Sequence, residues 1–395
     1  MKYSVAFVAG LICASGAAAS ASFEVPLQRR GGQSIDITNL RFKTVISQID
    51  YTVSKYTRAA ENYKRNTGKD HPLIKKSNTK RNNVKVNATV PLKDVEHELE
   101  WVGNITIGGQ EMLVDYDTGS GDLIINPEAY SPQKSNTSVT TGDSFSAAYA
   151  DGTSGDGKIF IDNVGLGNSI VAKNVSIGRA DKRYIVPEDE GGNQGIAGLS
   201  FPSITAFGSN HTSLVSAIAN NSNAAAPIFQ FNLKAGEGST LHIGDVDESK
   251  VSGNITYVDV NPRIGFWLTE AKIKGSIISA IIDSGTTLII GPEVEVLKVF
   301  HAVGGIETFT QSGTLYGAYD CDRDLKLSFT IGGTNYSIPK SLQSWGQTSD
   351  GRCVVSINGQ PSLPFHAWVV GDVFFQNRTI IFDAAKNRLG FADAK

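Results

Sequence analysis

The chain has 395 residues, of which 40% are hydrophobic and 19% are charged, and it contains 41 glycines. This composition excludes a disordered chain, and a formal net charge of −3 excludes an overall basic nucleic-acid-binding protein. No apolar run is long enough to span a bilayer, and the length is sufficient for two lobes or domains.

The near-neutral charge is the sum of two unequal parts. Residues 20–81 contain 13 Lys/Arg and 5 Asp/Glu, a net charge of +8, whereas residues 82–395 contain 22 and 34, a net charge of −12. Such asymmetry suggests a basic segment that docks on an acidic body. A basic linker is the alternative.

Residues 1–19 are typical of a secretory signal peptide. Lys2 precedes an uncharged stretch, and the small residues at 17–21 form an A-x-A cleavage pattern, whereas a membrane anchor would need a longer apolar run. We therefore expect a secreted protein, with a vacuolar destination as the alternative.

Removal of the signal peptide takes Cys13 away and leaves Cys321 and Cys353. An even pair in an oxidising compartment predicts a disulfide, and two free thiols are the alternative.

Residues 20–81 have the composition of a propeptide. The segment is polar and contains dibasic pairs at 75–76 and 80–81, which an exposed chain presents to processing proteases. Within it, Val45, Ile49, Val53 and Tyr56 recur at helical spacing, which predicts one amphipathic helix over 43–65. A solvated charge run without function is the alternative.

From about Trp101 the sequence is typical of a mostly β protein. Short runs rich in Val, Ile, Thr, Phe and Tyr alternate with turn clusters such as Gly108-Gly109 and Gly332-Gly333. Helices are expected at 213–219 and 293–302. We expect two β lobes, an N-terminal lobe over 82–262 and a C-terminal lobe over 263–395.

An internal repeat indicates that the two lobes are copies of one unit. The segment LVDYDTGS at 113–120 recurs in pattern as AIIDSGTT at 280–287, which makes Asp283 the equivalent of Asp117. Each copy is followed by two apolar residues and a glycine, at 196–198 and at 369–371. A duplicated lobe implies an approximate two-fold axis, and such an axis can bring Asp117 and Asp283 together.

Two adjacent carboxylates favour acid–base chemistry on a water molecule. Because two close carboxylates do not both ionise readily, one stays protonated while the other acts as a base. The base can deprotonate a water that attacks a peptide carbonyl, and the protonated partner stabilises the oxyanion. Gly119 and Gly285 permit close approach of the two loops, and Ser120 and Thr286 are candidate hydrogen-bond donors to the carboxylates. A single D-T-G triplet is a weak signal, but two copies in matching contexts are a strong one.

At these residues the chain resembles the pepsin-like aspartic endopeptidases, over about 101–392. The resemblance implies a bilobal fold with a cleft between the lobes, Asp117 and Asp283 as the catalytic pair, and Thr118, Gly119, Ser120, Ser284, Gly285 and Thr286 as their supports. It further implies a substrate-covering flap with Tyr149, Asp151 and Gly152, and a disulfide between Cys321 and Cys353. In such zymogens a propeptide lysine neutralises the catalytic carboxylates, and Lys75 or Lys76 are the candidates for that role.

Departures from the family pattern gather near the flap. Ile124 stands where the family usually has tryptophan, Ala150 replaces a glycine, and Gly121 replaces a serine. Asp115 and Asp151 resemble the pattern of fungal members that accept lysine at P1, because a carboxylate beside that pocket stabilises an ammonium group. A surface acid at each position is the alternative.

The sequence indicates no cofactor and no metal site, since zinc-protease, nucleophile-elbow and phosphate-loop motifs are missing. Asn-x-Ser/Thr triplets at Asn136, Asn210, Asn254 and Asn377 suit a glycosylated secreted protein. The expected protein is a monomeric secreted zymogen that matures to an acid endopeptidase, takes extended polypeptides as substrates and its own propeptide as inhibitor, and binds neither nucleic acid nor membrane. The rival interpretation is a non-catalytic binding or inhibitor protein with the same fold.

Overall fold

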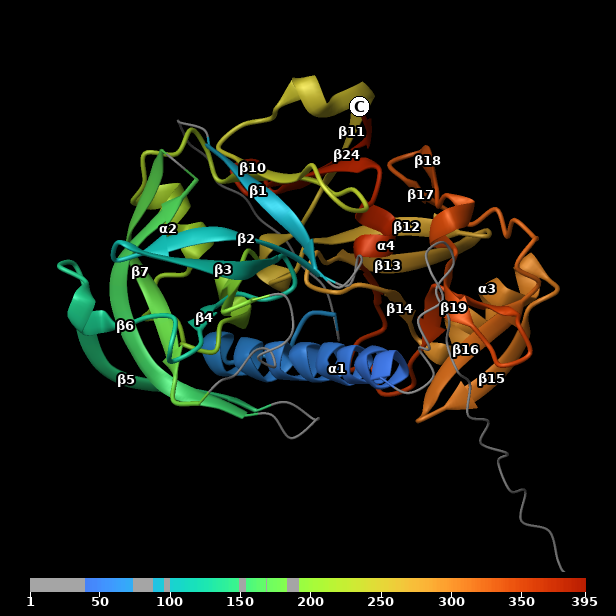
Figure 1. The fold of residues 1–395 in the computed structure, drawn as a ribbon, viewed down its shortest axis with the longest axis horizontal. Coiled ribbons are helices and arrows are strands. Elements are labelled where there is room, and N and C mark those ends of the chain that lie inside the picture. The colour runs from blue at the N-terminus through green and yellow to red at the C-terminus, as the bar shows by residue number, and fades with distance from the viewer. Residues whose placement is uncertain (1–39, 74–87, 96–99, 149–153, 168, 183–191) are drawn as a thin grey trace, which may run out of the picture.

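Two curled β lobes lie side by side, and one long helix crosses both of them (Figure 1). This computed structural model describes residues 40–73, 88–95, 100–148, 154–167, 169–182 and 192–395. The mostly β, bilobal architecture predicted from the repeat is confirmed.

The first sheet is built mainly from the N-terminal half of the chain but is completed by its last two strands. Within the described residues it contains thirteen strands. In spatial order they are β11 (Val251–Asp259), β24 (Arg388–Ala394), β23 (Arg378–Asp383), β9 (Ile228–Asn232), β10 (Ser239–Ile243), β1 (Ala88–Val95), β2 (Glu100–Ile107), β3 (Gln110–Asp117), β8 (Gly195–Gly198), β4 (Leu123–Ile125), β7 (Ile170–Ala180), β6 (Ser154–Leu166) and β5 (Val139–Ala148).

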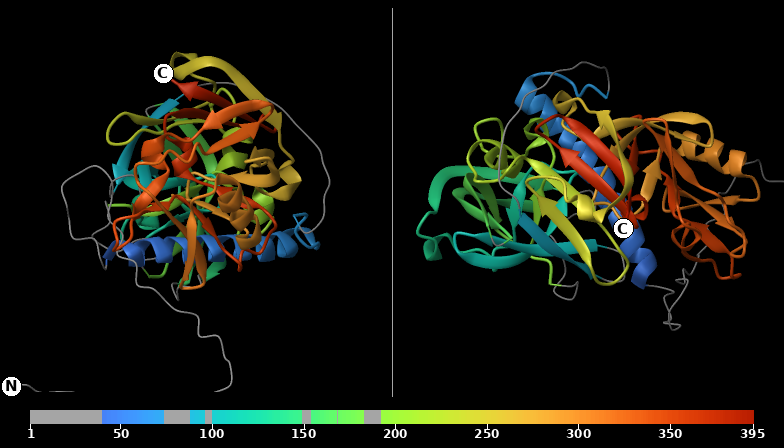
Figure 2. Two further views of the ribbon diagram at one scale, coloured as in Figure 1. Left: turned by 90° about the vertical axis from the view of Figure 1, so that its right-hand side faces the viewer. Right: turned by 90° about the horizontal axis from the view of Figure 1, so that it is seen from above.

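The second sheet lies wholly in the C-terminal half and contains eleven strands within the described ranges. In spatial order they are β18 (Thr334–Ser337), β17 (Ser328–Ile331), β12 (Leu268–Ile273), β13 (Ser276–Ile282), β22 (Trp368–Val370), β14 (Ile289–Gly291), β21 (Ile357–Gly359), β16 (Thr314–Tyr319), β20 (Cys353–Val355) and β19 (Ser344–Gln347), with β15 (Glu307–Gln311) paired to β16. Viewed from above, the sheets of the two halves occupy opposite sides of the molecule (Figure 2).

The burial of each strand explains why apolar and polar residues alternate in some strands, whereas other strands are apolar throughout. Along β12, alternate residues are buried, which is the pattern of a strand with one solvated face. By contrast β14 and β22 are buried at every position and are continuous apolar runs. The largest enclosed side chains include Trp267, Trp368 and Tyr116, so the core continues through both halves.

The amphipathic helix predicted over 43–65 is confirmed as α1 (Leu40–Thr67). The segment has neither glycine nor proline until Gly68, whose φ of 70° ends the helix while its N–H donates to Lys64 O at 2.9 Å. Lys64 and Arg65 lie in the last turn, where positive charge complements the helix dipole. Ile49 and Tyr56, two of the apolar residues that predicted it, are buried against the lobes.

The shorter helices agree with the sequence prediction where they are long enough to show a periodicity. The segments at 213–219 and 293–302 form α2 (Leu214–Asn220) and α3 (Glu293–Val303), and Ser213 caps the former. The four-residue α4 (Asp372–Phe375) was not predicted. Within the part of the chain described, no helix is long and apolar enough to cross a membrane.

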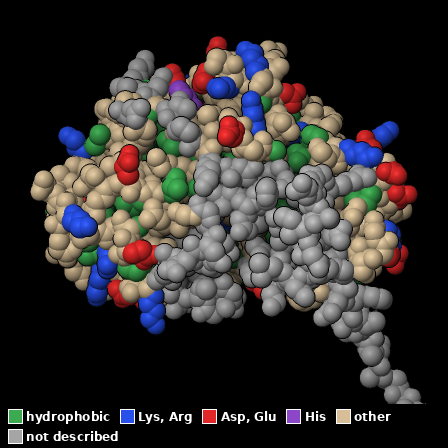
Figure 3. All heavy atoms as spheres, in the orientation of Figure 1, with side chains coloured by type: hydrophobic (Ala, Val, Ile, Leu, Met, Phe, Trp, Pro, Cys, Tyr) green, Lys and Arg blue, Asp and Glu red, His purple; other side chains and the backbone are tan. Residues whose placement is uncertain are grey.

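The predicted disulfide between Cys321 and Cys353 is confirmed, with Cα atoms 5.0 Å apart. Asn136, Asn210, Asn254 and Asn377, which begin Asn-x-Ser/Thr triplets, are exposed. Acidic and basic side chains are interspersed over both lobes on the face shown in Figure 3. No group of three His, Cys, Asp or Glu side chains suited to a metal ion occurs among the described residues.

Candidate active site

Two equivalent strand arrangements place the two aspartates at the junction of the lobes. Asp117 ends β3, which runs parallel to β8 and pairs Asp117 with Gly198. Asp283 directly follows β13, which runs parallel to β22, and its N–H donates to Val370 O at 3.1 Å. The apolar-apolar-glycine segments that the repeat singled out are therefore the neighbouring strands of the two aspartates.

Hydroxyl groups next to the aspartates join the two loops. Thr118 Oγ1 accepts from Ser284 N–H at 2.9 Å, and Ser284 Oγ accepts from Thr118 N–H at 3.1 Å. Each hydroxyl also donates to a backbone carbonyl of the opposite lobe, Thr118 to Ile282 O at 3.1 Å and Ser284 to Tyr116 O at 2.7 Å. These reciprocal contacts fix the separation of the two carboxylates.

The glycines allow the loops to approach as closely as they do. Gly119 N–H donates to Asp117 Oδ1 at 2.7 Å, and Gly285 N–H donates to Asp283 Oδ1 at 3.0 Å. A Cβ atom on either glycine would collide with the carboxylate of the opposite lobe. Only glycine leaves space for both carboxylates here.

The expected hydroxyl support is stronger on one side of the site. Thr286 Oγ1 donates to Asp283 Oδ2 at 2.6 Å, as predicted. Ser120 Oγ is buried beside Asp117, and its hydrogen bond to that carboxylate lowers the pKa of Asp117, although it is longer or less well aligned than the bond from Thr286.

The ammonium group of Lys55 on α1 lies between the two carboxylates. Its Nζ is 3.0 Å from Asp117 Oδ1 and 2.9 Å from Asp283 Oδ2, and it also donates to Gly285 O at 3.2 Å. The neighbouring Tyr56 hydroxyl donates to Asp283 Oδ2 at 2.8 Å. The prediction of Lys75 or Lys76 for this position is wrong, because Lys55 occupies it; those two lysines lie outside the described residues.

The charged groups of the site shift one another's pKa values. Burial disfavours the ammonium form of Lys55, but the two carboxylates outweigh this effect and raise its pKa. Burial raises the pKa of Asp117 to about 6, even though Lys55 opposes the rise and Asp283 adds to it. Burial acts on Asp283 in the same direction, yet Lys55 and the hydrogen bonds to the carboxylate lower its pKa overall. The two equivalent aspartates therefore differ in acidity.

The C-terminal half of α1 is tied to the first lobe around η2 (Pro202–Ile204). Asn62 Nδ2 donates to Ile204 O at 3.1 Å, Arg65 Nη2 to Ala206 O at 2.8 Å, and Asn66 Nδ2 to Thr205 O at 2.9 Å. Side-chain amides and a guanidinium thus supply the donors that loop carbonyls need.

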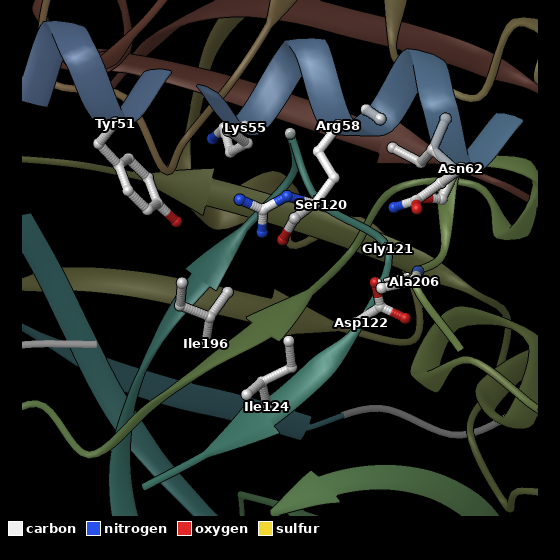
Figure 4. A pocket seen from close by; sticks show the side chains of 13 residues that line it. Tyr51, Lys55, Arg58, Asn62, Ser120, Gly121, Asp122, Ile124, Ile196 and Ala206 are labelled. Carbon is white, nitrogen blue, oxygen red and sulfur yellow. Dashed lines mark hydrogen bonds between the residues drawn. The ribbon is translucent and has the colours of Figure 1, made fainter. Parts of the chain in front are cut away.

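A small cavity of about 50 Å³ remains between α1 and the first lobe. Figure 4 shows the Arg58 side chain reaching from α1 towards Ser120 and Ile196, with Asp122 and Ile124 on the lobe side. Ile124 lines this cavity. Burial raises the pKa of Asp122 to about 7.

Of the remaining predicted site residues, the structure describes only Asp115. Asp115 is buried on β3, with 8% of its surface exposed. Tyr149, Asp151 and Gly152 lie outside the described residues.

Lys55 and Tyr56 were missed by the sequence prediction, although a signal for Lys55 exists. It follows Thr52 by three residues and precedes Ala59 by four, so it lies on the buried stripe of the helix, where an unpaired charge is unfavourable.

Comparisons with known proteins agree on one family. The family model for eukaryotic aspartyl protease matches residues 100–394. Secreted aspartyl protease 1 of Malassezia globosa is 38% identical over 396 residues, which is 99% of each chain. Penicillopepsin-1 of Penicillium janthinellum is 30% identical over 74% of this chain and 94% of its own. The solved aspartic proteinase of Irpex lacteus covers 78% of this chain and 98% of its own with a TM-score of 0.65 and 21% identity, a similarity in fold.

Proposed function

The chain belongs to the eukaryotic aspartyl protease family and is an aspartic-type endopeptidase, and on that premise we propose that it is made as a secreted zymogen that becomes active in acid. In this proposal residues 1–19 are the signal peptide and residues 20–81 the inhibitory propeptide. The enzyme itself then consists of an N-terminal lobe over 82–262 and a C-terminal lobe over 263–395, and acts as a monomer.

Asp117 and Asp283 are the proposed catalytic pair. With the propeptide gone, a water molecule between the carboxylates is deprotonated by the ionised aspartate as it attacks the peptide carbon. The protonated aspartate stabilises the oxyanion and later supplies a proton to the leaving amine. Thr118 and Ser284 keep the loops in register, and Gly119 and Gly285 donate backbone hydrogen bonds that orient the carboxylates.

The position of Lys55 supports the zymogen proposal more than any other observation. Its ammonium group occupies the space between the carboxylates where the attacking water has to lie, at 3.0 and 2.9 Å from their oxygens. Tyr56 also occupies a lone pair of Asp283. Neither a substrate carbonyl nor a catalytic water fits between the aspartates while α1 is docked.

One experiment tests the reaction and the dyad together. The full chain is expressed in a secretory host and acidified, and protein digestion is measured with and without pepstatin. Wild-type activity is expected to be abolished by pepstatin and by Asp283→Asn. Pepstatin-insensitive activity, or full activity of the variant, would overturn the assignment of the pair.

The same expression experiment addresses localisation. We propose export, because residues 1–19 have the features of a signal peptide and a similar protein is named a secreted aspartyl protease. Retention of the enzyme in the vacuole of a fungal host would support the vacuolar alternative instead. The non-catalytic alternative is dropped, because the chain is an endopeptidase of this family.

We further propose that Asp115 and Asp151 favour lysine at P1, with an extended peptide lying in the cleft under a flap that includes Tyr149 and Gly152. A carboxylate beside the pocket would stabilise the ammonium group of the substrate. A peptide library profiled with wild-type enzyme and with Asp151→Ser tests this. An unchanged lysine preference in the variant would remove Asp151 from the proposal.

A further inference from the structure

We propose that His71 is an acid-sensitive latch that holds the end of the propeptide on the C-terminal lobe while its imidazole is neutral and releases it when the imidazole gains a proton. This inference deepens the proposed function and rests on the zymogen role given to α1. It concerns a residue four positions after the last residue of α1, outside the lysine–aspartate contact already described.

Both ring nitrogens of His71 are used by the docked backbone. His71 Nδ1 accepts a hydrogen bond from Leu73 N–H at 3.2 Å, and His71 Nε2 lies 2.5 Å from Ile264 O in η4 (Pro262–Ile264). Since a carbonyl only accepts, Nε2 carries the hydrogen and Nδ1 does not. The docked geometry therefore specifies the neutral tautomer protonated at Nε2.

A proton on Nδ1 of His71 is incompatible with these hydrogen bonds. It would point at the N–H of Leu73, so that two donors face each other and one hydrogen bond is lost. The ring is 1% exposed, which prevents water from compensating for the loss. Protonation is therefore compatible with an undocked His71 but not with the docked one.

The surroundings of the ring are aromatic. The ring centroid of His71 is 4.6 Å from that of Tyr63, 4.7 Å from that of Phe365 and 5.3 Å from that of Phe266. Tyr63 belongs to α1, whereas the two phenylalanines belong to the enzyme. Burial in this cluster lowers the pKa of His71 to about 4, although the bond to Ile264 opposes the shift.

The cluster connects the latch to the carboxylate pair. Phe266 and Phe365 also contact Tyr56, at centroid distances of 5.0 and 6.4 Å, and Tyr56 donates to Asp283. The same two phenylalanines thus hold both His71 and the tyrosine next to Lys55. Release of His71 removes packing from the side of the cluster that supports Tyr56.

Among the described residues, the charged and titratable groups on the elements around His71 do not provide it with a counter-ion. They are Tyr63 and the exposed Lys64–Asp70 ion pair at the end of α1, Arg263 on η4, and His366 next to Phe365. Only burial and the Ile264 carbonyl act on the acidity of the ring. The carboxylate in this set, Asp70, is exposed and paired with Lys64, so it does not stabilise an imidazolium at the buried ring.

The pH dependence follows from proton linkage. A histidine whose pKa is lower when docked than when free takes up a proton on release, so acid favours release between the two values. With an ordinary pKa of 6.5 and a docked pKa of about 4, the docking constant falls about tenfold per pH unit in this window. Between pH 7 and pH 5 the expected loss is roughly 30-fold, and it reaches roughly 300-fold below pH 4.

Hydrogen exchange on the full chain tests the latch without relying on proteolysis. Opening of α1 is measured by brief deuterium pulses at pH 7 and pH 5, analysed on unprocessed chain for wild type and for His71→Gln. Glutamine offers one donor and one acceptor and does not titrate. The opening constant is expected to rise roughly 30-fold more in wild type than in His71→Gln between these pH values.

The controls separate this inference from the zymogen proposal. His242→Gln, which removes a histidine paired with Asp245 on the first sheet, is expected to behave as wild type. An equal rise in opening for His71→Gln and wild type overturns the latch, whatever the enzyme digests. A chain that digests nothing after acidification overturns the proposed function, and the exchange data still report on the latch.

A second measurement applies if His71→Gln does not dock at pH 7. The imidazole of His71 is then titrated in wild-type chain, by the exchange rate of its Cε1 hydrogen in the peptide that contains it. Half-titration below pH 5 in the docked chain supports the latch. A midpoint near 6.5 overturns it.

Discussion

Lys55 lies between two carboxylates that the two halves of a duplicated chain supply. Its ammonium group is almost fully buried and has carboxylate partners on both sides. A buried charge contributes favourably only while its partners remain ionised, so the removal of either side of this contact has a large effect.

The first prediction concerns Lys55→Met. Removing the ammonium leaves two buried carboxylates facing each other, and loss of one partner of a buried ion pair costs about 3–5 kcal/mol. We expect the opening constant of α1 at pH 7, measured by hydrogen exchange, to rise by a factor of 10² or more. Lys64→Met, at an exposed ion pair of the same helix, serves as the control and should leave it unchanged. Equal protection of α1 in Lys55→Met and wild type would contradict the assigned role.

The second prediction concerns Gly285→Ala. The added methyl group would collide with the carboxylate of Asp117, so the two aspartates have to move apart. Because displacements of about 1 Å are costly in an active site, we expect proteolysis by the mature enzyme to fall about 100-fold or more. Gly351→Ala, where a Cβ meets nothing within 4 Å, should keep full activity despite its φ of 84°. Comparable activity in both variants would show that the close approach is not required.

At the residue scale, the sequence identified what is repeated and missed what occurs once. Asp117 and Asp283 stood out because their contexts recur. Lys55 and His71 have no second copy. The position of Lys55 on the buried stripe of α1 indicates that it needs a partner, but the sequence does not identify the partner of either residue. The dibasic pair at 75–76 stood out for a different reason, because an exposed dibasic pair is a cleavage site for processing proteases.

At the element scale, the disulfide joins the polar loop after β16 to β20, the strand that pairs with it. The bridge constrains about 33 residues of the unfolded chain. We predict that the double variant Cys321→Ser with Cys353→Ala lowers the free energy of unfolding of the mature enzyme by roughly 3–4 kcal/mol, measured by denaturant titration. Wild type under reducing conditions should approach the variant, whereas coincident curves for oxidised wild type and variant would contradict this.

Element prediction succeeded where local signals were sufficient. α2 has a serine cap and α1 an uninterrupted run of helix-compatible residues, so both were visible. α4 spans only four residues, which are too few to show a helical period in the sequence. Its existence depends on the fold around it.

At the scale of the whole molecule, we predict that loss of the Asp283 charge releases the propeptide in strong acid. The pKa of Asp117 is raised to about 6 in the docked chain, so protonation of Asp117 favours docking and does not drive release. The pKa of Asp283 is lowered from 3.8, so its contribution is complete above 3.8 and is lost as pH falls through the lower docked value. The first-order processing rate of the full chain should therefore rise steeply below pH 4, beyond the rise that the His71 latch gives at higher pH.

Lys55→Met provides the matched comparison, because it lacks the contact that depends on Asp283. Its processing rate should lose the steep part of the profile below pH 4. A wild-type rate that is constant from pH 7 to pH 3 would rule out carboxylate protonation as the trigger.

The two-lobed architecture followed from the repeat, but the partner of the last strands did not. β23 and β24 come from the C-terminal half, yet they extend the first sheet, with Ile381 opposite Gln230. A strand's sequence records its burial on each face and not the identity of a partner about 150 residues away. This pairing needed the structure.

The pairing of β9 with β23 sets an order for biosynthesis. A ribosome that has made the whole N-terminal half has not yet made the strand that covers the edge of β9. Until residue 383 emerges, that edge exposes unpaired backbone groups in a compartment crowded with other chains. Ribosome-bound chains that end before residue 378 should be cleaved within 228–243 by added protease, and full-length chains should resist. Equal resistance would show that the edge is protected in another way during synthesis.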